Sequence, residues 1–386
     1  MSKSVWNKNF TLLFIISGLI ITAFYLLLPI WPLFIEEVIG ADRKSVGILM
    51  MIFTGSAIVS RPISGFILDT YDKKKLYLYS TLLFILLVFA YYFISSLNYL
   101  YLVWGLQGFI WGIATTSSST IVVDVIPKET RGRGVGIIGL SVPISMAIGS
   151  FLSLTIKDKL GYDWVFSLAI AFGLIGTLII LFLKIPKYKS NKHFNLRNLF
   201  AYKAIPIALN NFLITLSYSS IVIYISLFAK EINSEHAGIF FLVFSVAIGI
   251  SRLIGGKLVD KSGPKKNIFA GTLLLTLGFI LLYYTNNTLP LLVAALIQGL
   301  GFGLVMPTFQ VMANNVVSKS DRGAANSTFF IAFDLGVGLG SMLFGYVSEL
   351  IELRFIYILS ACFSALALLI FYYKIYPEYN ANLVKE

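Results

Sequence analysis

The sequence SRPISGFILD at residues 60–69 recurs as SRLIGGKLVD at residues 251–260, 191 positions later. The same offset, without a gap, places Gln107-Gly108 on Gln298-Gly299. Further matches at this offset are Lys74-Lys75 with Lys265-Lys266, Gly112 with Gly303, Arg131-Gly132 with Arg322-Gly323, and Gly149 with Gly340. Because the matches extend over about ninety residues, they indicate an internal duplication.

The repeat lies in a chain that is too apolar for a water-facing surface. Of 386 residues, 58% are hydrophobic and only 12% are charged, and the mean hydropathy is +0.85. Soluble domains are charged at about a quarter of their positions, so the surplus apolar surface requires lipid. The 32 Phe and 21 Tyr suit side chains that pack against acyl chains and lie at headgroup level.

Apolar runs of roughly twenty residues, the length that spans about 30 Å of hydrocarbon, recur along the chain. The predicted helices are 10–34, 45–68, 76–96, 99–125, 134–156, 164–184, 204–229, 237–259, 267–286, 289–316, 324–348 and 354–375. An offset of six helices gives both copies the same orientation, which is a parallel repeat. The sequence therefore predicts an all-α polytopic membrane protein of two pseudo-symmetric six-helix bundles, 1–184 and 204–386, joined by a basic cytoplasmic linker at 185–203.

Positive charge is distributed unevenly among the predicted loops. With the amino terminus inside, 22 of the 30 Lys and Arg residues fall on the cytoplasmic side and 6 on the outer side, while Arg61 and Arg252 lie within helices. Because Lys and Arg bias sets topology, we expect both termini in the cytoplasm and a multi-pass location in the inner membrane.

Several function classes find no support. The net charge of +12 lies in short loops and does not indicate nucleic-acid binding. His193, His236 and Cys362 form no metal-binding pattern and no disulfide, and no Walker loop points to ATP. We therefore expect no metal, no cofactor and no catalytic residue, and do not expect an enzyme.

The residues around the repeated aspartates carry a family resemblance. GKLVDKSGPKK at residues 256–266 has a Gly, three residues, an Asp, and then basic residues around a Gly. GFILDTYDKK at residues 65–74 follows the same pattern, with Thr70 where Arg is usual and Asp72 where Gly is usual. Over nearly its whole length the chain resembles a major facilitator superfamily transporter, of the twelve-helix drug/proton antiporter or sugar-efflux-like branch. The resemblance implies alternating access around a central substrate cavity.

The same resemblance implies a cytoplasmic gate. Asp69 and Asp260 end the second and eighth predicted helices, where a carboxylate can pair with a helix N-terminus of the other half. Such a pairing contributes roughly 0.3–1 kcal/mol, or about 2 when partly buried; simple solvation of a helix end is the alternative. The predicted gating residues are Gly65, Asp69, Gly256, Asp260, Lys265 and Lys266.

Arg61 and Arg252 lie two helical turns before these aspartates, about 12 Å deeper in the membrane. Because an Arg at this depth is costly and faces the protein interior, both are candidates. We favour a structural or gating role, since both halves carry the residue. Binding of an anionic group, or pairing with an internal carboxylate, is the alternative.

Asp334 lies in the middle of a predicted helix, where Pro143 stands in the other half. A lone carboxyl group in hydrocarbon is neutral, because desolvation disfavours its charged form. This makes Asp334 a candidate proton carrier; a hydrogen bond to a neighbouring helix is an equal alternative.

Other polar residues are open to two interpretations. Asp124 is favoured as a local ion pair with Lys128, Arg131 or Arg133, and otherwise as a coupling residue. Gln107 and Gln298 either line the cavity or form interhelical hydrogen bonds. Trp104 and Ala295 stand three residues before them, where the family often has an Arg. Glu36 and Glu37 are favoured as solvated interface acids over proton-uptake groups.

The glycine-rich helices 134–156 and 324–348 permit close backbone approach, and we expect them to pack across the two halves. Val142-Pro143 and Gly149 match the antiporter pattern of the fifth helix in part, which favours export. The favoured function is proton-driven export of a small amphipathic molecule by a monomer in the lipid bilayer. Proton-coupled uptake of a metabolite and a non-transporting membrane sensor are the rivals, because a fold fixes neither cargo nor direction.

Overall fold

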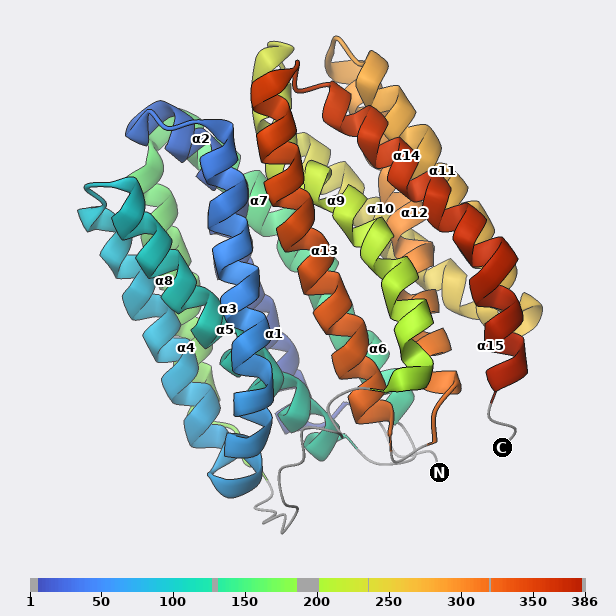
Figure 1. The fold of residues 1–386 in the computed structure, drawn as a ribbon. Helices are drawn as coiled ribbons and strands as arrows, with labels where there is room; N and C mark the ends of the chain where they lie inside the picture. The colour runs from blue at the N-terminus through green and yellow to red at the C-terminus, as the bar shows by residue number, and fades with distance from the viewer. Residues whose placement is uncertain (1–5, 127–130, 186–200, 235, 319–320, 384–386) are drawn as a thin grey trace. The chain divides into compact units, whose positions relative to one another are not determined.

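The computed structural model describes residues 6–126, 131–185, 201–234, 236–318 and 321–383, without the side chains of 65–66, 69–70, 131–133, 135 and 254–262. These residues are almost entirely helical (Figure 1). The chain divides into two compact units. Unit 1 comprises residues 1–34 and 52–194, and unit 2 comprises residues 35–51 and 195–386.

The helices of the first half begin with α1 (Lys8–Leu27), which continues through η1 (Leu28–Ile30), α2 (Trp31–Phe34) and η2 (Ile35–Ile39). Pro29 and Pro32 interrupt the regular helix here, because proline lacks the N–H that an α-helix needs. The remaining elements are α3 (Arg43–Thr70), α4 (Lys73–Phe89), η3 (Ala90–Phe93), α5 (Leu97–Val125), α6 (Arg131–Gly139), α7 (Ser141–Leu160) and α8 (Tyr162–Ile180).

The second half repeats this order of long helices. Its elements are η6 (Tyr202–Ala204), α9 (Ile205–Glu231), α10 (Ala237–Ser262), α11 (Pro264–Tyr284), α12 (Thr288–Asn315), α13 (Arg322–Leu350), α14 (Phe355–Ile370), η7 (Phe371–Ile375) and α15 (Tyr376–Asn382). Local sequence sets several boundaries. Asn7, Asp72, Ser96 and Asn287 each cap a helix N-terminus through the side chain, and Gly263 takes a φ of +72° between α10 and α11.

Ten helices of the described residues are long and apolar enough to cross a membrane. The described apolar part of α10, Ala237–Leu253, is shorter, and α5 is not among the ten. The multi-pass all-α fold is thus confirmed, while the count of twelve crossings stays a prediction. The helix predicted at 134–156 is divided at Leu140 into α6 and α7. The predicted linker lies largely outside the described residues, so the domain boundaries also stay a prediction.

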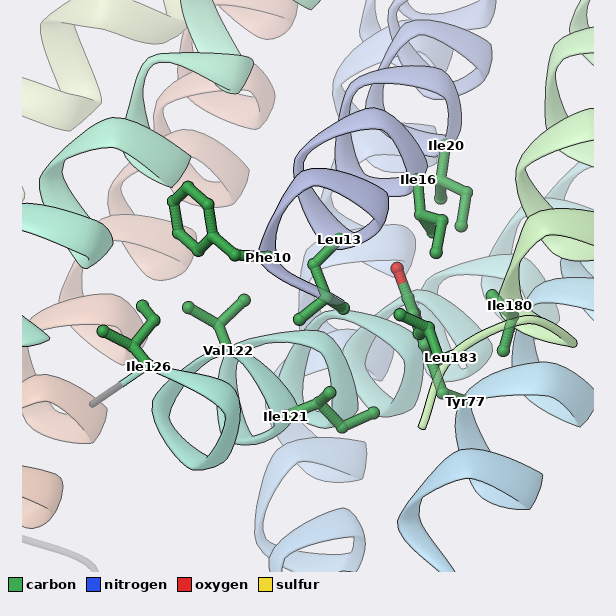
Figure 2. Packing of buried hydrophobic residues seen from close by; sticks show 10 residues of the cluster. All are labelled: Phe10, Leu13, Ile16, Ile20, Tyr77, Ile121, Val122, Ile126, Ile180 and Leu183. Atoms are coloured by element: carbon green, nitrogen blue, oxygen red, sulfur yellow. The ribbon is translucent and has the colours of Figure 1, made fainter. Parts of the chain in front are cut away.

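Unit 1 contains a cluster of buried apolar side chains. Figure 2 shows Phe10 and Leu13 of α1 beside Val122 and Ile121 of α5. The other members of the cluster are Ile16, Ile20, Tyr77, Ile126, Ile180 and Leu183. The cluster joins α1, α4, α5 and the end of α8.

One close helix crossing is the same in both units. A Cβ built on Gly108 of α5 would lie 2.9 Å from the carbonyl carbon of Phe53 in α3. In unit 2, a Cβ on Gly299 of α12 would lie 3.0 Å from the carbonyl carbon of Phe244 in α10. Phe53 and Phe244 are themselves 191 residues apart. Since only glycine lets the backbones approach this closely, the duplication seen in the sequence is also a duplication of packing.

Candidate functional site

The repeated arginines follow directly on these crossings. One turn beyond Gly108 and Gly299, a Cβ on Gly112 would meet Ser60, and a Cβ on Gly303 would meet Ser251. Both serines are buried, and the Arg after each is half-buried. Arg61 and Arg252 thus occupy equivalent places, and their role stays a prediction.

The gating motif is described only in part. The side chains of Gly65, Asp69, Gly256 and Asp260 lie outside the described residues. Lys265 places its Nζ 4.5 Å from the ring centroid of Tyr372 and 5.1 Å from that of Tyr376. These distances are within the range of cation–π attraction. The neighbouring Lys266 is exposed.

Asp334 is half-buried near the middle of α13. The glycines that follow it approach α9, because a Cβ on Gly336 would lie 2.8 Å from the carbonyl oxygen of Phe212. Gly340 likewise meets Leu216, and Gly149 of α7 meets the α1 backbone. These three glycines therefore lie against helices of their own half, and packing of their helices across the halves stays a prediction.

The repeated glutamines connect neighbouring helices within each unit. Both are fully buried. The side-chain amide of Gln107 donates to the carbonyl of Phe84 in α4 at 3.5 Å, and that of Gln298 donates to the carbonyl of Leu275 in α11 at 3.1 Å. The two acceptors are also 191 residues apart. This geometry favours interhelical hydrogen bonding over cavity lining.

Asp124 has a described partner that the sequence did not suggest. Its Oδ2 lies 2.6 Å from Nζ of Lys73 at the start of α4, and both side chains are mostly buried. Lys128 and the side chains of Arg131 and Arg133 lie outside the described residues. In unit 2 the equivalent Asn315 instead donates to the Tyr379 hydroxyl at 3.2 Å. The charged contact of one half is therefore neutral in the other.

Each unit also contains a stacked aromatic pair, which the sequence analysis missed. In unit 1, the rings of Phe24 and Trp111 have centroids 4.4 Å apart and planes inclined by 18°. In unit 2, Tyr218 and Phe302 stack at 4.1 Å and 14°. Phe24 and Trp111 are half-buried, whereas Tyr218 and Phe302 are buried.

The two aromatic pairs are related by the repeat. Trp111 and Phe302 are 191 residues apart, and Phe24 and Tyr218 are 194 apart. Phe53 and Phe244 flank the pairs, at 5.5 Å from Phe24 and 6.2 Å from Tyr218. The 191-residue offset was a signal for Trp111 and Phe302 only, and aromatic matches are too common in apolar helices for this one to stand out.

A charged network was also missed. It comprises Glu36, Glu37, Arg43, Lys230, Glu231 and Glu349, all in unit 2 and all at the end predicted to face outside. Glu36 and Glu37, expected to be solvated interface acids, are members of this network. Asp42, next to it and just before α3, accepts hydrogen bonds from the Ser45 backbone and hydroxyl. Burial acts to raise the pKa of Asp42, but the hydrogen bonds from Ser45 and Lys44 outweigh it and the pKa is lowered from 3.8.

Known proteins resemble the chain along nearly its whole length. The staphylopine export protein of Staphylococcus aureus is 24% identical over 338 residues, which cover 83% of this chain and 85% of that protein. The multi-drug resistance efflux pump PmrA of Streptococcus pneumoniae is 22% identical, covering 89% of this chain and 90% of the pump.

Solved structures show the same fold. A bacterial homolog of the human lysosomal transporter Spinster has a TM-score of 0.80 at 15% identity and covers all of both chains. The nucleoside transporter NupG has a TM-score of 0.73 at 16% identity, covering 95% of this chain and 98% of NupG. The sequence model of the Major Facilitator Superfamily matches residues 13–206 and again residues 207–386. The chain, with its two equivalent helix bundles, therefore belongs to the Major Facilitator Superfamily, whose members are transporters and not enzymes.

Proposed function

We propose that the protein exports a small amphipathic molecule from the cytoplasm in exchange for protons, by alternating access. Its amino and carboxyl termini lie in the cytoplasm, as the Lys and Arg bias of the loops indicates. One chain suffices for transport, and the 1–184 and 204–386 halves are its moving bodies.

The proposed substrate class rests on the two stacked aromatic pairs, one in each unit. Aromatic faces offer large apolar area together with attraction for cations, which suits a lipophilic molecule with a polar or positively charged part. The stacks lie on α1 and α5 in unit 1, and on α9 and α12 in unit 2. The resemblance to an efflux pump and an export protein over more than four fifths of each sequence supports export.

Proton coupling is assigned to Asp334. A carboxyl group that is half-buried in the middle of a helix can bind a proton in one state and release it in another, provided that its surroundings differ between the two. Arg61 and Arg252 are the candidate cations for that difference. Asp69 and Asp260 close the cytoplasmic gate.

The test uses purified protein in proteoliposomes, with ethidium as a planar lipophilic cation and an imposed pH gradient of either direction. An imposed proton gradient should drive ethidium in the direction opposite to the proton flow. An ethidium gradient should in turn drive protons in the direction opposite to ethidium. Trp111→Leu and Phe302→Leu should each weaken ethidium transport, whereas Leu289→Ala, at an exposed position of α12, should not. Movement of probe and protons in the same direction would favour uptake by symport. No gradient-driven transport across a panel of amphipathic cations and neutral metabolites would contradict the proposal.

A further inference from the structure

A small pocket lies at the end of unit 2 that is predicted to face the cytoplasm. Its lining is partly apolar and partly polar, and includes Ile207 of α9, Val316 at the end of α12, Ile375 of η7, Lys203 and Glu378. About 10 Å³ of the pocket is open to the centres of water molecules, which is room for about one water at a time. Because Lys203 is exposed, the pocket begins at the surface and water can enter it.

Two asparagines lie one helical turn beyond this pocket. Asn210 and Asn211 follow Ile207 by three and four residues, so they share its side of α9. Their side chains are 1% and 0% exposed. Within the described part of the chain, none of their amide nitrogens and oxygens has a hydrogen-bond partner. A buried carboxamide gives up its hydration, so it needs a partner such as a bound water in its place.

Unit 1 has no such pair of amides at the equivalent place. The helices α1 and α9 align at an offset of 194 residues, as their stacked aromatic residues do, and this offset places Ile16 on Asn210 and Ser17 on Asn211. Ile16 is fully buried in the apolar cluster of Figure 2. The hydroxyl of Ser17 has a partner, Ser118, at 3.5 Å. The shared fold therefore does not require the asparagines, which points to a role of their own in unit 2.

The same stretch of α9 borders the part of α13 that carries Asp334. The hydroxyl of Thr215 donates to the carbonyl of Asn211 at 3.1 Å. A Cβ on Gly336 of α13 would meet Thr215 and would lie 2.8 Å from the carbonyl oxygen of Phe212. Asp334 stands two residues before Gly336. The asparagines thus lie along α9 between the pocket and this crossing.

We propose that the pocket, Asn210 and Asn211 form a water-filled inlet, through which protons pass between the cytoplasmic end of unit 2 and Asp334. A carboxamide both donates and accepts hydrogen bonds, so each asparagine can hold a water on either side. Protons then move from water to water, while the amides keep the waters in line and stay neutral. The inlet rests on the proposed function, which makes Asp334 the proton carrier. It lies within one unit, so protons need not share the path of the substrate.

The first experiment measures whether water reaches Asn210. Cys362, the one native cysteine, is replaced by Ser, and Asn210→Cys or Ile16→Cys then supplies a single buried thiol. Protein in nanodiscs is exposed briefly to Ag⁺ in nitrate buffer, and the unreacted thiols are quantified with a fluorescent maleimide after denaturation. Asn210→Cys should react about ten-fold faster than Ile16→Cys, because a thiol ionises in contact with water and resists ionisation in apolar surroundings. Equal rates would overturn the proposal.

The second experiment plugs the pocket with Val316→Phe. Val317→Phe is the matched control, because Val317 is also buried but is not among the described residues that line the pocket. Val316→Phe should slow the Ag⁺ reaction of Asn210→Cys several-fold. In proteoliposomes it should slow the proton movement that an ethidium gradient drives, without slowing ethidium exchange at equal pH. Val317→Phe should change neither rate, and Val316→Leu takes the place of Val316→Phe if the larger variant does not fold.

The outcomes separate the inlet from the proposed function. Proton movement at the parental rate in a plugged variant whose Ag⁺ reaction is slowed would overturn the inlet as a proton route. Absence of proton movement in the unaltered protein would instead contradict the proposed function. The Ag⁺ rates need no substrate, so they would still decide whether the inlet is hydrated.

Discussion

Replacement of Gly299 by Ala tests whether the duplicated helix crossing is as close as the structure shows. The added methyl group would lie 3.0 Å from the carbonyl carbon of Phe244 and 2.7 Å from the Cβ of Ala247. Neither neighbour is the end of a flexible side chain, so α10 and α12 must move apart. The equivalent Gly108→Ala would lie 2.9 Å from the carbonyl carbon of Phe53 and should behave alike.

The magnitude follows from overpacking, which costs about 1–3 kcal/mol when a methyl group enters a filled space. Alanine also favours a helix over glycine by up to about 1 kcal/mol, which offsets part of this cost. Gly249→Ala, also in α10, measures that offset alone, because no atom lies within 4 Å of its built Cβ. We therefore expect Gly299→Ala to be about 2 kcal/mol less stable than Gly249→Ala.

The assay is the thermal midpoint of the detergent-solubilised protein, followed as loss of the monodisperse size-exclusion peak. Gly299→Ala should unfold at a lower temperature by about 2–3 °C, while Gly249→Ala should match or exceed the parent. Equal midpoints for the two variants would refute the close crossing. Unequal effects of Gly108→Ala and Gly299→Ala would show that the two halves do not share it.

Asp334→Asn should keep substrate binding and exchange while losing uphill, pH-driven transport in proteoliposomes; uphill transport at the parental rate would leave it a structural residue. Asp260→Asn should slow transport more than it lowers expression and should favour the state open to the cytoplasm, and normal transport would remove its gating role. Lys192→Cys should not be modified by an impermeant thiol reagent applied to intact cells. Its modification would contradict the predicted topology. Gln298→Leu should lower stability by about 1 kcal/mol with little change in transport, and a selective loss of transport would instead place it at the cavity.

The sequence predicted the fold well because its signals are long and local. Apolar runs of membrane-spanning length and a gap-free repeat need no knowledge of distant contacts. The predictions were wrong about the helix at 134–156, which is divided at Leu140 into α6 and α7, just before Pro143, whose missing N–H interrupts regular helical hydrogen bonding. The first helix also differs from its prediction, because Pro29 and Pro32 interrupt it and irregular turns follow as far as Ile39.

The candidate site was harder to predict, because its contacts join residues far apart in sequence. Arg43 and Glu349 are 306 positions apart, and nothing in either local sequence indicates the other. For Asp124 the sequence favoured nearby basic residues, whereas the described partner is Lys73, 51 positions before it. Antiparallel packing of α4 and α5 brings the start of one helix to the end of the other. Only the folded arrangement reveals such a pair.

The two copies of the repeat share a helix crossing but differ in a charged contact. Gly108 and Gly299 each face a backbone carbonyl group, so a larger residue at either place would force the two helices apart. At Asp124 and Asn315 the two copies instead drifted apart, one toward an ion pair and the other toward a neutral amide contact. The two copies thus keep the same helix crossing while differing in the charge of this contact.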